Sequence, residues 1–106
     1  MASSSSTVDV LTTIARSMVV SHEYASVEEA LQHMALSEVR RRTAYYQRRI
    51  QTLERKHNAD FQTFSARLEG RATPSEEDDW LAWRSANRML ADWQKTYEKL
   101  SAQADN

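Results

Sequence analysis

The chain contains almost no residues that interrupt regular backbone structure. Its 106 residues include one glycine, Gly70, one proline, Pro74, and no cysteine, whereas average usage gives about seven glycines and five prolines. Because tight turns and phosphate-binding loops rely on glycine for positive φ angles, this composition argues against a β-sandwich, a Rossmann unit and a glycine-rich phosphate loop. The lack of cysteine excludes disulfides, thiolate nucleophiles and cysteine-ligated zinc.

Long hydrophobic runs are also missing. The most apolar stretch, residues 8–20, contains Asp9 and Arg16 and is shorter than the roughly 20 apolar residues that cross a membrane. It makes a poor signal peptide, because no charged segment precedes it and Arg16 interrupts it. We therefore expect a cytoplasmic protein that does not associate with membranes.

The remaining composition is typical of a soluble helical protein with a limited core. Hydrophobic residues make up 41% of the chain, charged residues 27%, and the formal net charge is −1. We expect a disordered tip over residues 1–7, because its serine run buries nothing to offset the entropy cost of ordering. Residues 8–106 are predicted to form a single helical domain.

A long helix is predicted over residues 27–57. Ser26 and Glu29 form a capping box at its start, and no glycine or proline follows before Gly70. At about 1.5 Å per residue the helix is roughly 46 Å long, so we expect an elongated molecule. A seam with alternating spacings of three and four residues, typical of a helix that packs against another helix, consists of Leu36, Val39, Thr43, Tyr46, Ile50, Leu53 and His57.

A corner is predicted directly after this helix. Asn58 tolerates the left-handed backbone that ends a helix, and Asp60 is a suitable N-cap for a short helix over residues 61–69. Gly70 follows as the residue that ends the short helix. The chain therefore changes direction between residues 58 and 73.

The final helix is predicted over residues 74–103. Thr73 and Glu76 form a second capping box, and Pro74 occupies the first helical position, where proline is favoured. The predicted apolar stripe of this helix consists of Trp80, Trp83, Asn87, Leu90, Trp93, Tyr97 and Leu100.

These signals predict an all-α fold, an elongated antiparallel hairpin of two long helices with the short helix at the corner and a short N-terminal helix. Residues 8–20 are ambiguous, because their β-branched content suits a strand. Leu11, Ile14 and Met18 lie at helical spacings, and we favour the helix.

The long helix carries a concentration of positive charge. Residues 36–57 contain seven basic and two acidic side chains, a local charge of +5. Six of the cations form two rows with seven-residue spacing, namely Arg41, Arg48 and Arg55, and Arg42, Arg49 and Lys56. Such rows are typical of a solvated helix face, and they also suit docking to an acidic protein surface or a phosphate backbone.

Opposite charge gathers at residues 69–79, where five acidic side chains and one arginine give −4. Most of these carboxylates lie in the first turn of the last helix, where the helix dipole favours them. Consecutive helical residues point to different sides, and calcium loops need alternating ligands around a turn glycine. We expect no metal site here.

The aromatic residues exceed what a thin helical hairpin can bury. Three tryptophans accompany two phenylalanines and four tyrosines, and Leu81 and Met89 lie off the apolar stripe of the last helix. A helix that is apolar on more than one side needs a second partner. We therefore expect a homo-oligomer or a heterocomplex.

No pattern predicts catalysis. The three histidines, His22, His33 and His57, lie in different segments, and neither an HExxH motif nor a Ser-His-Asp arrangement is present. Acid–base catalysis needs a partly dry pocket, which a helical hairpin seldom provides. We expect a non-enzymatic protein without a cofactor or a small-molecule substrate.

Three short motifs follow one another along the chain. Residues 45–50 (YYQRRI) match a tyrosine-containing basic helix, residues 56–64 (KHNADFQTF) match a K-Y-G/N-x-x-F-x-x-F corner, and residues 76–83 (EEDDWLAW) match an acidic start to a final helix. In these motifs the chain resembles the TumA-like antitoxins, small helical bacterial proteins encoded beside toxins. The chain departs from the family pattern at His57, where tyrosine is common, and at Asn58, where glycine is common.

The resemblance implies a type II antitoxin that binds and neutralises a cognate toxin, often a ribonuclease-like enzyme. Aromatic and arginine side chains dominate the energetics of protein interfaces, so the candidate partner-binding residues are Arg41, Tyr45, Arg48, Arg49, Arg55, Phe61, Phe64, Trp80, Trp83 and Trp93.

Three alternatives stay open at this point. Residues 8–35 are compatible with a strand and two helices, as in a ribbon–helix–helix unit that binds operator DNA. The chain is also compatible with a coiled-coil module that only assembles its own oligomer. A nucleic-acid-binding protein that uses the arginine rows is the third alternative.

Overall fold

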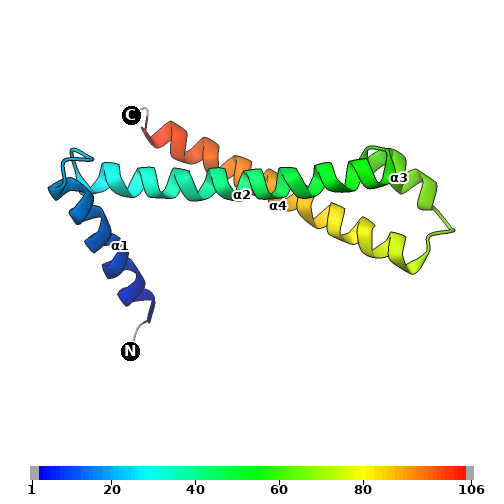
Figure 1. Cartoon of the computed structure of the whole chain (residues 1–106), viewed down its shortest axis with the longest axis horizontal. Helices are drawn as coiled ribbons and strands as arrows, with labels where there is room; N and C mark the ends of the chain where they lie inside the picture. Colours follow the sequence, from blue (N-terminus) through cyan, green and yellow to red (C-terminus); the bar gives the residue numbers. More distant parts are fainter. Residues whose placement is uncertain (1–2, 105–106) are drawn as a thin grey trace. The chain divides into compact units, whose positions relative to one another are not determined.

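The computed structural model describes residues 3–104, and these residues form four helices connected by short segments (Figure 1). The helices are α1 (Ser3–Val20), α2 (Val27–His57), α3 (Phe61–Leu68) and α4 (Pro74–Ala104). No strand occurs between residues 3 and 104. The predicted all-α fold is confirmed, and the bounds of α2, α3 and α4 agree with the predicted ones to within one residue.

The N-terminal prediction needs two corrections. Helix α1 begins at Ser3, so residues 3–7 are helical rather than a disordered tip, and residues 1 and 2 lie outside the described part of the chain. A ribbon–helix–helix unit requires a strand before its two helices. That prediction is wrong, because residues 8–20 are helical. Hydroxyl side chains are compatible with this helix because they bond back to it, and Thr13 Oγ1 donates to the Asp9 carbonyl at 2.9 Å.

Helix α1 ends in a hydrogen-bonded turn. His22 takes a positive φ of 67° and its N–H donates to the Val19 carbonyl at 2.9 Å, while the Glu23 N–H donates to the Met18 carbonyl at 2.9 Å. These two bonds are those of a Schellman motif, with histidine in the position that glycine usually takes.

The helices group into two compact units, where the sequence predicts one helical domain. Of the described residues, one unit contains 3–38 and 99–104, and the other contains 39–98. In the first unit, Ala15 and Ala30 are fully buried. Several large apolar side chains of α1 are exposed, and they are Val8, Val10, Leu11, Ile14 and Val20.

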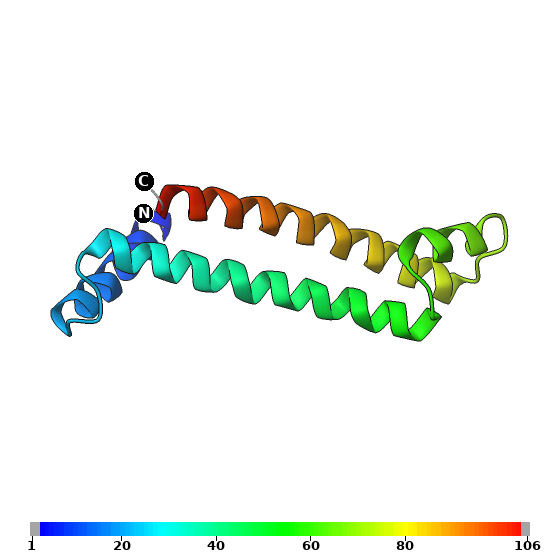
Figure 2. The same ribbon diagram turned by 90° about the horizontal axis from the view of Figure 1, so that it is seen from above.

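The second unit is an antiparallel hairpin. Residues 39–57 of α2 and residues 74–98 of α4 run in opposite directions, and α3 lies at the turn between them (Figure 2). Val39 and Leu53 of the predicted α2 seam are buried, and the other seam residues of this unit are partly buried. The heptad prediction is therefore confirmed.

The core of this unit lies at the corner. Leu53, Phe64 and Trp83 are buried together, one from each of α2, α3 and α4. Partly buried hydrophobic side chains pack around them, and these are Ile50, Ala59, Phe61, Leu68 and Trp80.

The predicted helix ends form as expected. Asn58 and Gly70 have positive φ angles of 49° and 74°, and Asp60 Oδ1 accepts a hydrogen bond from the Thr63 N–H at 2.7 Å. The Thr73–Glu76 capping box is complete, because each side chain bonds the other residue's backbone N–H. Each cap contributes about 1 kcal/mol to helix stability.

Candidate protein interface

The structure divides the ten predicted partner-binding residues into two groups. Phe64 and Trp83 are buried, with exposed fractions of 2% and 1%. Phe61, Trp80 and Trp93 are partly buried, and Phe61 and Trp80 pack against the core of Leu53, Phe64 and Trp83. The exposed group is Arg41, Tyr45, Arg48, Arg49 and Arg55, all on α2.

The buried group forms an aromatic corner, which we define as His57, Phe61, Phe64, Trp80 and Trp83. The Trp83 ring stacks on Phe64 with centroids 5.4 Å apart and contacts Phe61 at 5.6 Å. The His57 ring lies 4.0 Å from Phe64. Such contacts stabilise the fold by burial and by ring geometry. They account for Phe64 and Trp83 without a partner, and a partner contact of these two rings stays a prediction.

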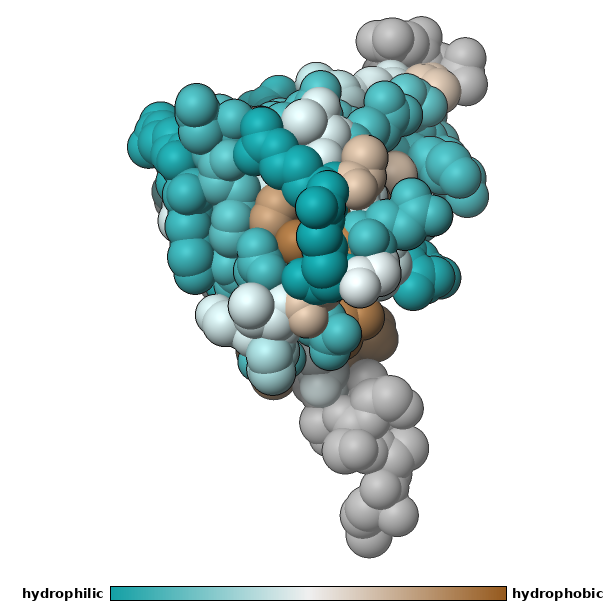
Figure 3. Space-filling model, turned by 90° about the vertical axis from the view of Figure 1, so that its right-hand side faces the viewer, coloured by the Kyte–Doolittle hydropathy of each residue, from teal (hydrophilic) through white to brown (hydrophobic). Residues whose placement is uncertain are grey.

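The outer surface of the corner is mainly polar. Figure 3 views the molecule from the α3 end, and hydrophilic side chains cover most of this face, with hydrophobic atoms in small patches between them. Phe64 and Trp83 contribute almost nothing to the surface, whereas the partly buried Leu68 and Trp80 line a hollow of about 210 Å³.

The Trp80 side chain is held by contacts with α3 and with its own helix. Its indole Nε1–H donates to Ser65 Oγ at 2.8 Å, and the Ser65 hydroxyl donates to the Phe61 carbonyl at 2.8 Å. The Arg84 guanidinium lies over the ring at 5.6 Å from the centroid. Trp93 differs, because its buried Nε1 has no hydrogen-bond partner among the described residues.

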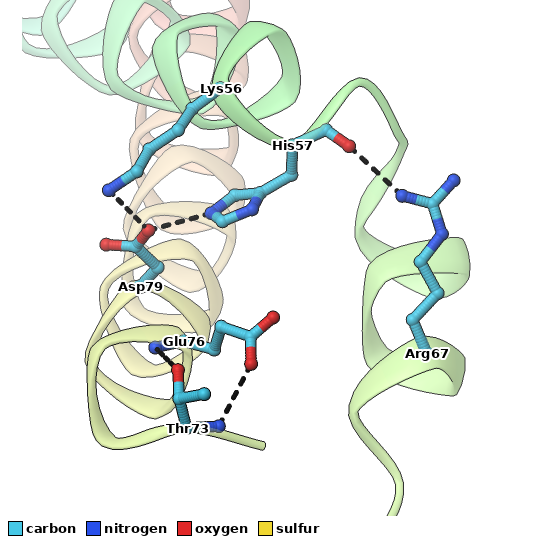
Figure 4. A network of polar contacts seen from close by, with 6 residues as sticks. All are labelled: Lys56, His57, Arg67, Thr73, Glu76 and Asp79. Carbon is cyan, nitrogen blue, oxygen red and sulfur yellow. Dashed lines mark hydrogen bonds and ion pairs between the residues drawn. The ribbon is translucent and has the colours of Figure 1, made fainter. Parts of the chain in front are cut away.

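A polar network closes the corner, and sequence reasoning missed it (Figure 4). Asp79 Oδ2 lies 2.7 Å from His57 Nε2 and 2.8 Å from Lys56 Nζ. The Arg67 side chain donates to the His57 carbonyl at 3.1 Å. Sequence analysis assigned Asp79 only to the helix dipole, because no sequence pattern pairs it with residues 22 and 23 positions earlier.

The carboxylates of the corner have shifted pKa values. The hydrogen bond from Lys56, more than the bond from His57, lowers the pKa of Asp79 despite partial burial. Backbone N–H bonds lower the pKa values of two capping residues, Asp60 through Thr63 and Glu76 through Thr73. In each case the bond stabilises the charged form of the carboxyl group.

The exposed group forms a basic face on α2, which we define as the two cation rows and Tyr45 between them. All six cations of the rows are exposed. A rotation of about 100° per residue places Tyr45 between the row of Arg41 and Arg48 and the row of Arg42 and Arg49. Tyr45 is 45% exposed, which makes it an accessible aromatic ring surrounded by cations.

Contacts within the basic face fix the position of Tyr45. The Arg49 guanidinium lies over the Tyr45 ring at 5.8 Å from the centroid, and the Tyr46 ring meets Tyr45 edge-on at 5.0 Å. A hollow of about 340 Å³ is lined by Arg41, Arg42, Tyr45, Tyr46 and Arg48. The ring is thus held in place before any partner arrives, which lowers the entropy cost of binding.

The remaining hollows, carboxylates and helices of residues 3–104 indicate neither a metal site nor a membrane span. A hollow of about 640 Å³ lies between α2 and α4 of the second unit and is lined by Arg40, Thr43, Ala44, Gln47, Gln94, Tyr97 and Glu98. Within this described range, no three His, Cys, Asp or Glu side chains gather closely enough to hold a metal ion. None of the described helices is sufficiently long and apolar to cross a bilayer.

Comparison of the chain with protein-family models, with curated proteins and with solved structures gave no match.

Proposed function

We propose that this chain is a non-enzymatic antitoxin, which uses the basic face of α2 to bind an acidic surface on a cognate toxin. The observation that carries the proposal is Tyr45, an exposed aromatic ring held between two rows of exposed cations. Aromatic and arginine side chains are the residue types that contribute most to binding in protein interfaces. The toxin as the partner rests on the resemblance of residues 45–83 to TumA-like antitoxins.

Charge supports a protein partner over nucleic acid. The chain as a whole has a net charge of −1, whereas dedicated nucleic-acid-binding domains are usually clearly basic. At the end of the basic face, Asp79 bonds Lys56 at 2.8 Å, so a carboxylate adjoins the last cation of the row. A long phosphate backbone is repelled by such carboxylates, but a partner protein of limited acidic area avoids them.

Co-purification tests this proposal. The chain is produced together with the product of the neighbouring gene, which carries an affinity tag, and the complex is captured at low salt. We expect the wild-type chain to co-purify and the double variant Arg48→Glu plus Arg49→Glu to lose binding about tenfold or more, because each reversal replaces attraction with repulsion. Failure of the wild-type chain to bind overturns the proposal.

A matched control separates the basic face from net charge. Arg88 and Lys95 are exposed cations seven residues apart on α4, so Arg88→Glu plus Lys95→Glu changes the net charge equally. We expect the control variant to bind within about twofold of wild type, apart from a small long-range effect that salt screens. Equal losses in both double variants contradict a localised binding face.

Self-association is a second candidate function, and the apolar surface of α1 favours it. Leu11 and Ile14 are 41% and 43% exposed, and Val10 is 58% exposed. Contiguous exposed apolar residues mark association sites. Sedimentation of the wild type against Leu11→Ser plus Ile14→Ser tests it, with Arg16→Ser as the control. A monomeric wild type at high concentration removes this candidate.

A further inference from the structure

We infer that the basic face of α2 receives an acidic α-helix of its partner, with carboxylates at seven-residue spacing on both sides of an apolar strip. The inference rests on the proposed function, because it specifies which element of the partner occupies the face. It concerns the geometry of recognition, which net charge alone does not determine.

The spacing of the cations favours a helix. Members of each row are seven residues apart, which corresponds to about 10.5 Å along the α2 axis. Carboxylates seven residues apart on a partner helix have the same spacing, so successive arginines of a row can meet successive carboxylates, while Lys56 at the end of its row keeps its ion pair with Asp79. A strand of duplex nucleic acid advances about 3.4 Å per phosphate, so only about every third phosphate coincides with a cation of the row.

The strip between the rows favours a helix as well. Within the extent of the rows, Tyr45 and Thr52 occupy it at seven-residue spacing, and Tyr45 is its one large ring. In helix pairs, apolar side chains along the seam contact the partner while flanking charged residues pair across it. On α2, Tyr45 is positioned to contact an apolar strip of the partner helix, and the two cation rows are positioned to pair with carboxylates on either side of that strip.

The rows also match the way two helices cross. A seven-residue repeat drifts about 20° per heptad around a straight α-helix. A partner that follows the rows crosses α2 at a shallow angle, as in the common packing with an angle of about 20° and an axial distance of 8–10 Å. The rows extend from Arg41 to Lys56, and each row therefore spans two heptads.

Two synthetic peptides of identical composition test the inference. Both are helical and about three heptads long. In the first peptide, glutamates repeat every seven residues on each side of a leucine strip, and in the second the same residues are permuted so that the glutamates surround the helix. A fluorescent label reports binding to the full chain as anisotropy, and circular dichroism confirms equal helicity of the peptides.

We expect the first peptide to bind about tenfold more tightly than the permuted one, because only the first pairs its carboxylates with both rows. Arg48→Glu plus Arg49→Glu removes this preference, and Arg88→Glu plus Lys95→Glu retains it. Equal affinity of the two peptides overturns the inference, and so does tighter binding of a labelled DNA duplex than of the first peptide.

The same measurement distinguishes failure of the inference from failure of the proposed function. The tagged product of the neighbouring gene is added as a competitor. If it binds at the basic face but the two peptides bind equally, the helical partner element is wrong and the antitoxin function stands. If it does not bind at all, the proposed function is wrong, and the peptide preference still decides whether the face recognises a helix.

Discussion

The aromatic corner and the basic face are both rich in the residue types that protein interfaces use, but they present them differently. At the corner, Phe64 and Trp83 are almost completely buried, and the polar groups around them are bonded to one another. On α2, Tyr45 and the neighbouring arginines are exposed. Residue type alone therefore does not locate an interface. Aromatic side chains stabilise the fold at the corner, whereas the aromatic ring of Tyr45 is accessible to a partner on α2.

The largest expected effect comes from removing the centre of the corner. Trp83→Ala eliminates a ring that contacts Phe61 and Phe64, and we expect it to lower the free energy of unfolding by about 3–5 kcal/mol. Urea denaturation followed by circular dichroism measures this loss. Tyr45→Ala is the comparison, with an expected change of about 0.5 kcal/mol at most. Similar losses for both variants contradict the distinction between the two regions.

An intermediate effect is expected at the cap of α4. Thr73→Ala removes the hydroxyl that accepts from the Glu76 N–H at 3.2 Å, and we expect a loss of about 1 kcal/mol. The exposed Ser75, two residues away, provides the control variant Ser75→Ala. Urea denaturation measures both variants, and equal urea midpoints show that the Thr73 cap contributes nothing to stability.

A smaller effect on stability is expected when the pH is lowered, and it comes from the corner rather than from the basic face. The pKa of Asp79 is lowered in the folded state, so the folded chain holds this proton less tightly than the unfolded chain. The resulting stabilisation is present above the ordinary pKa of about 4 and is lost as the pH falls through the lowered value.

Urea midpoints measured from neutral pH down to about pH 3 test this dependence. We expect stability to fall in acid, and Asp79→Asn to remove part of the dependence on pH. Asp78→Asn is the neighbouring control and retains it. An Asp79→Asn variant with the full acid dependence shows that other carboxylates account for it.

The sequence predicts the local features of the fold well. Asn58, Asp60, Gly70 and Thr73 each act through their own backbone or through residues a few positions away, so their signals are visible in short segments. The α2 seam is predicted for a similar reason, because its heptad spacing reports which side of the helix faces a neighbour. These features are sufficient to place the corner and the helix bounds.

Two kinds of feature were not predicted. The Asp79 contacts join residues more than twenty positions apart, and no periodic pattern encodes such a pair. Helical spacing does place Trp83 on the apolar stripe of the last helix and leaves Tyr45 off the seam, but how completely each ring is buried depends on tertiary packing, which short segments do not encode. The helical residues 3–7 were missed because a serine-rich composition was interpreted as disorder, although hydroxyl side chains are compatible with a helix.

The central claim is that the arginines and Tyr45 of the basic face, which we propose bind a partner, are separate from the residues that stabilise the fold. One variant, Arg48→Glu plus Arg49→Glu, tests it most directly when its urea midpoint and its co-purification with the neighbouring gene product are measured on the same sample. We predict an unchanged midpoint and a loss of binding of about tenfold or more. A complex that persists undiminished, with the fold intact, contradicts the claim.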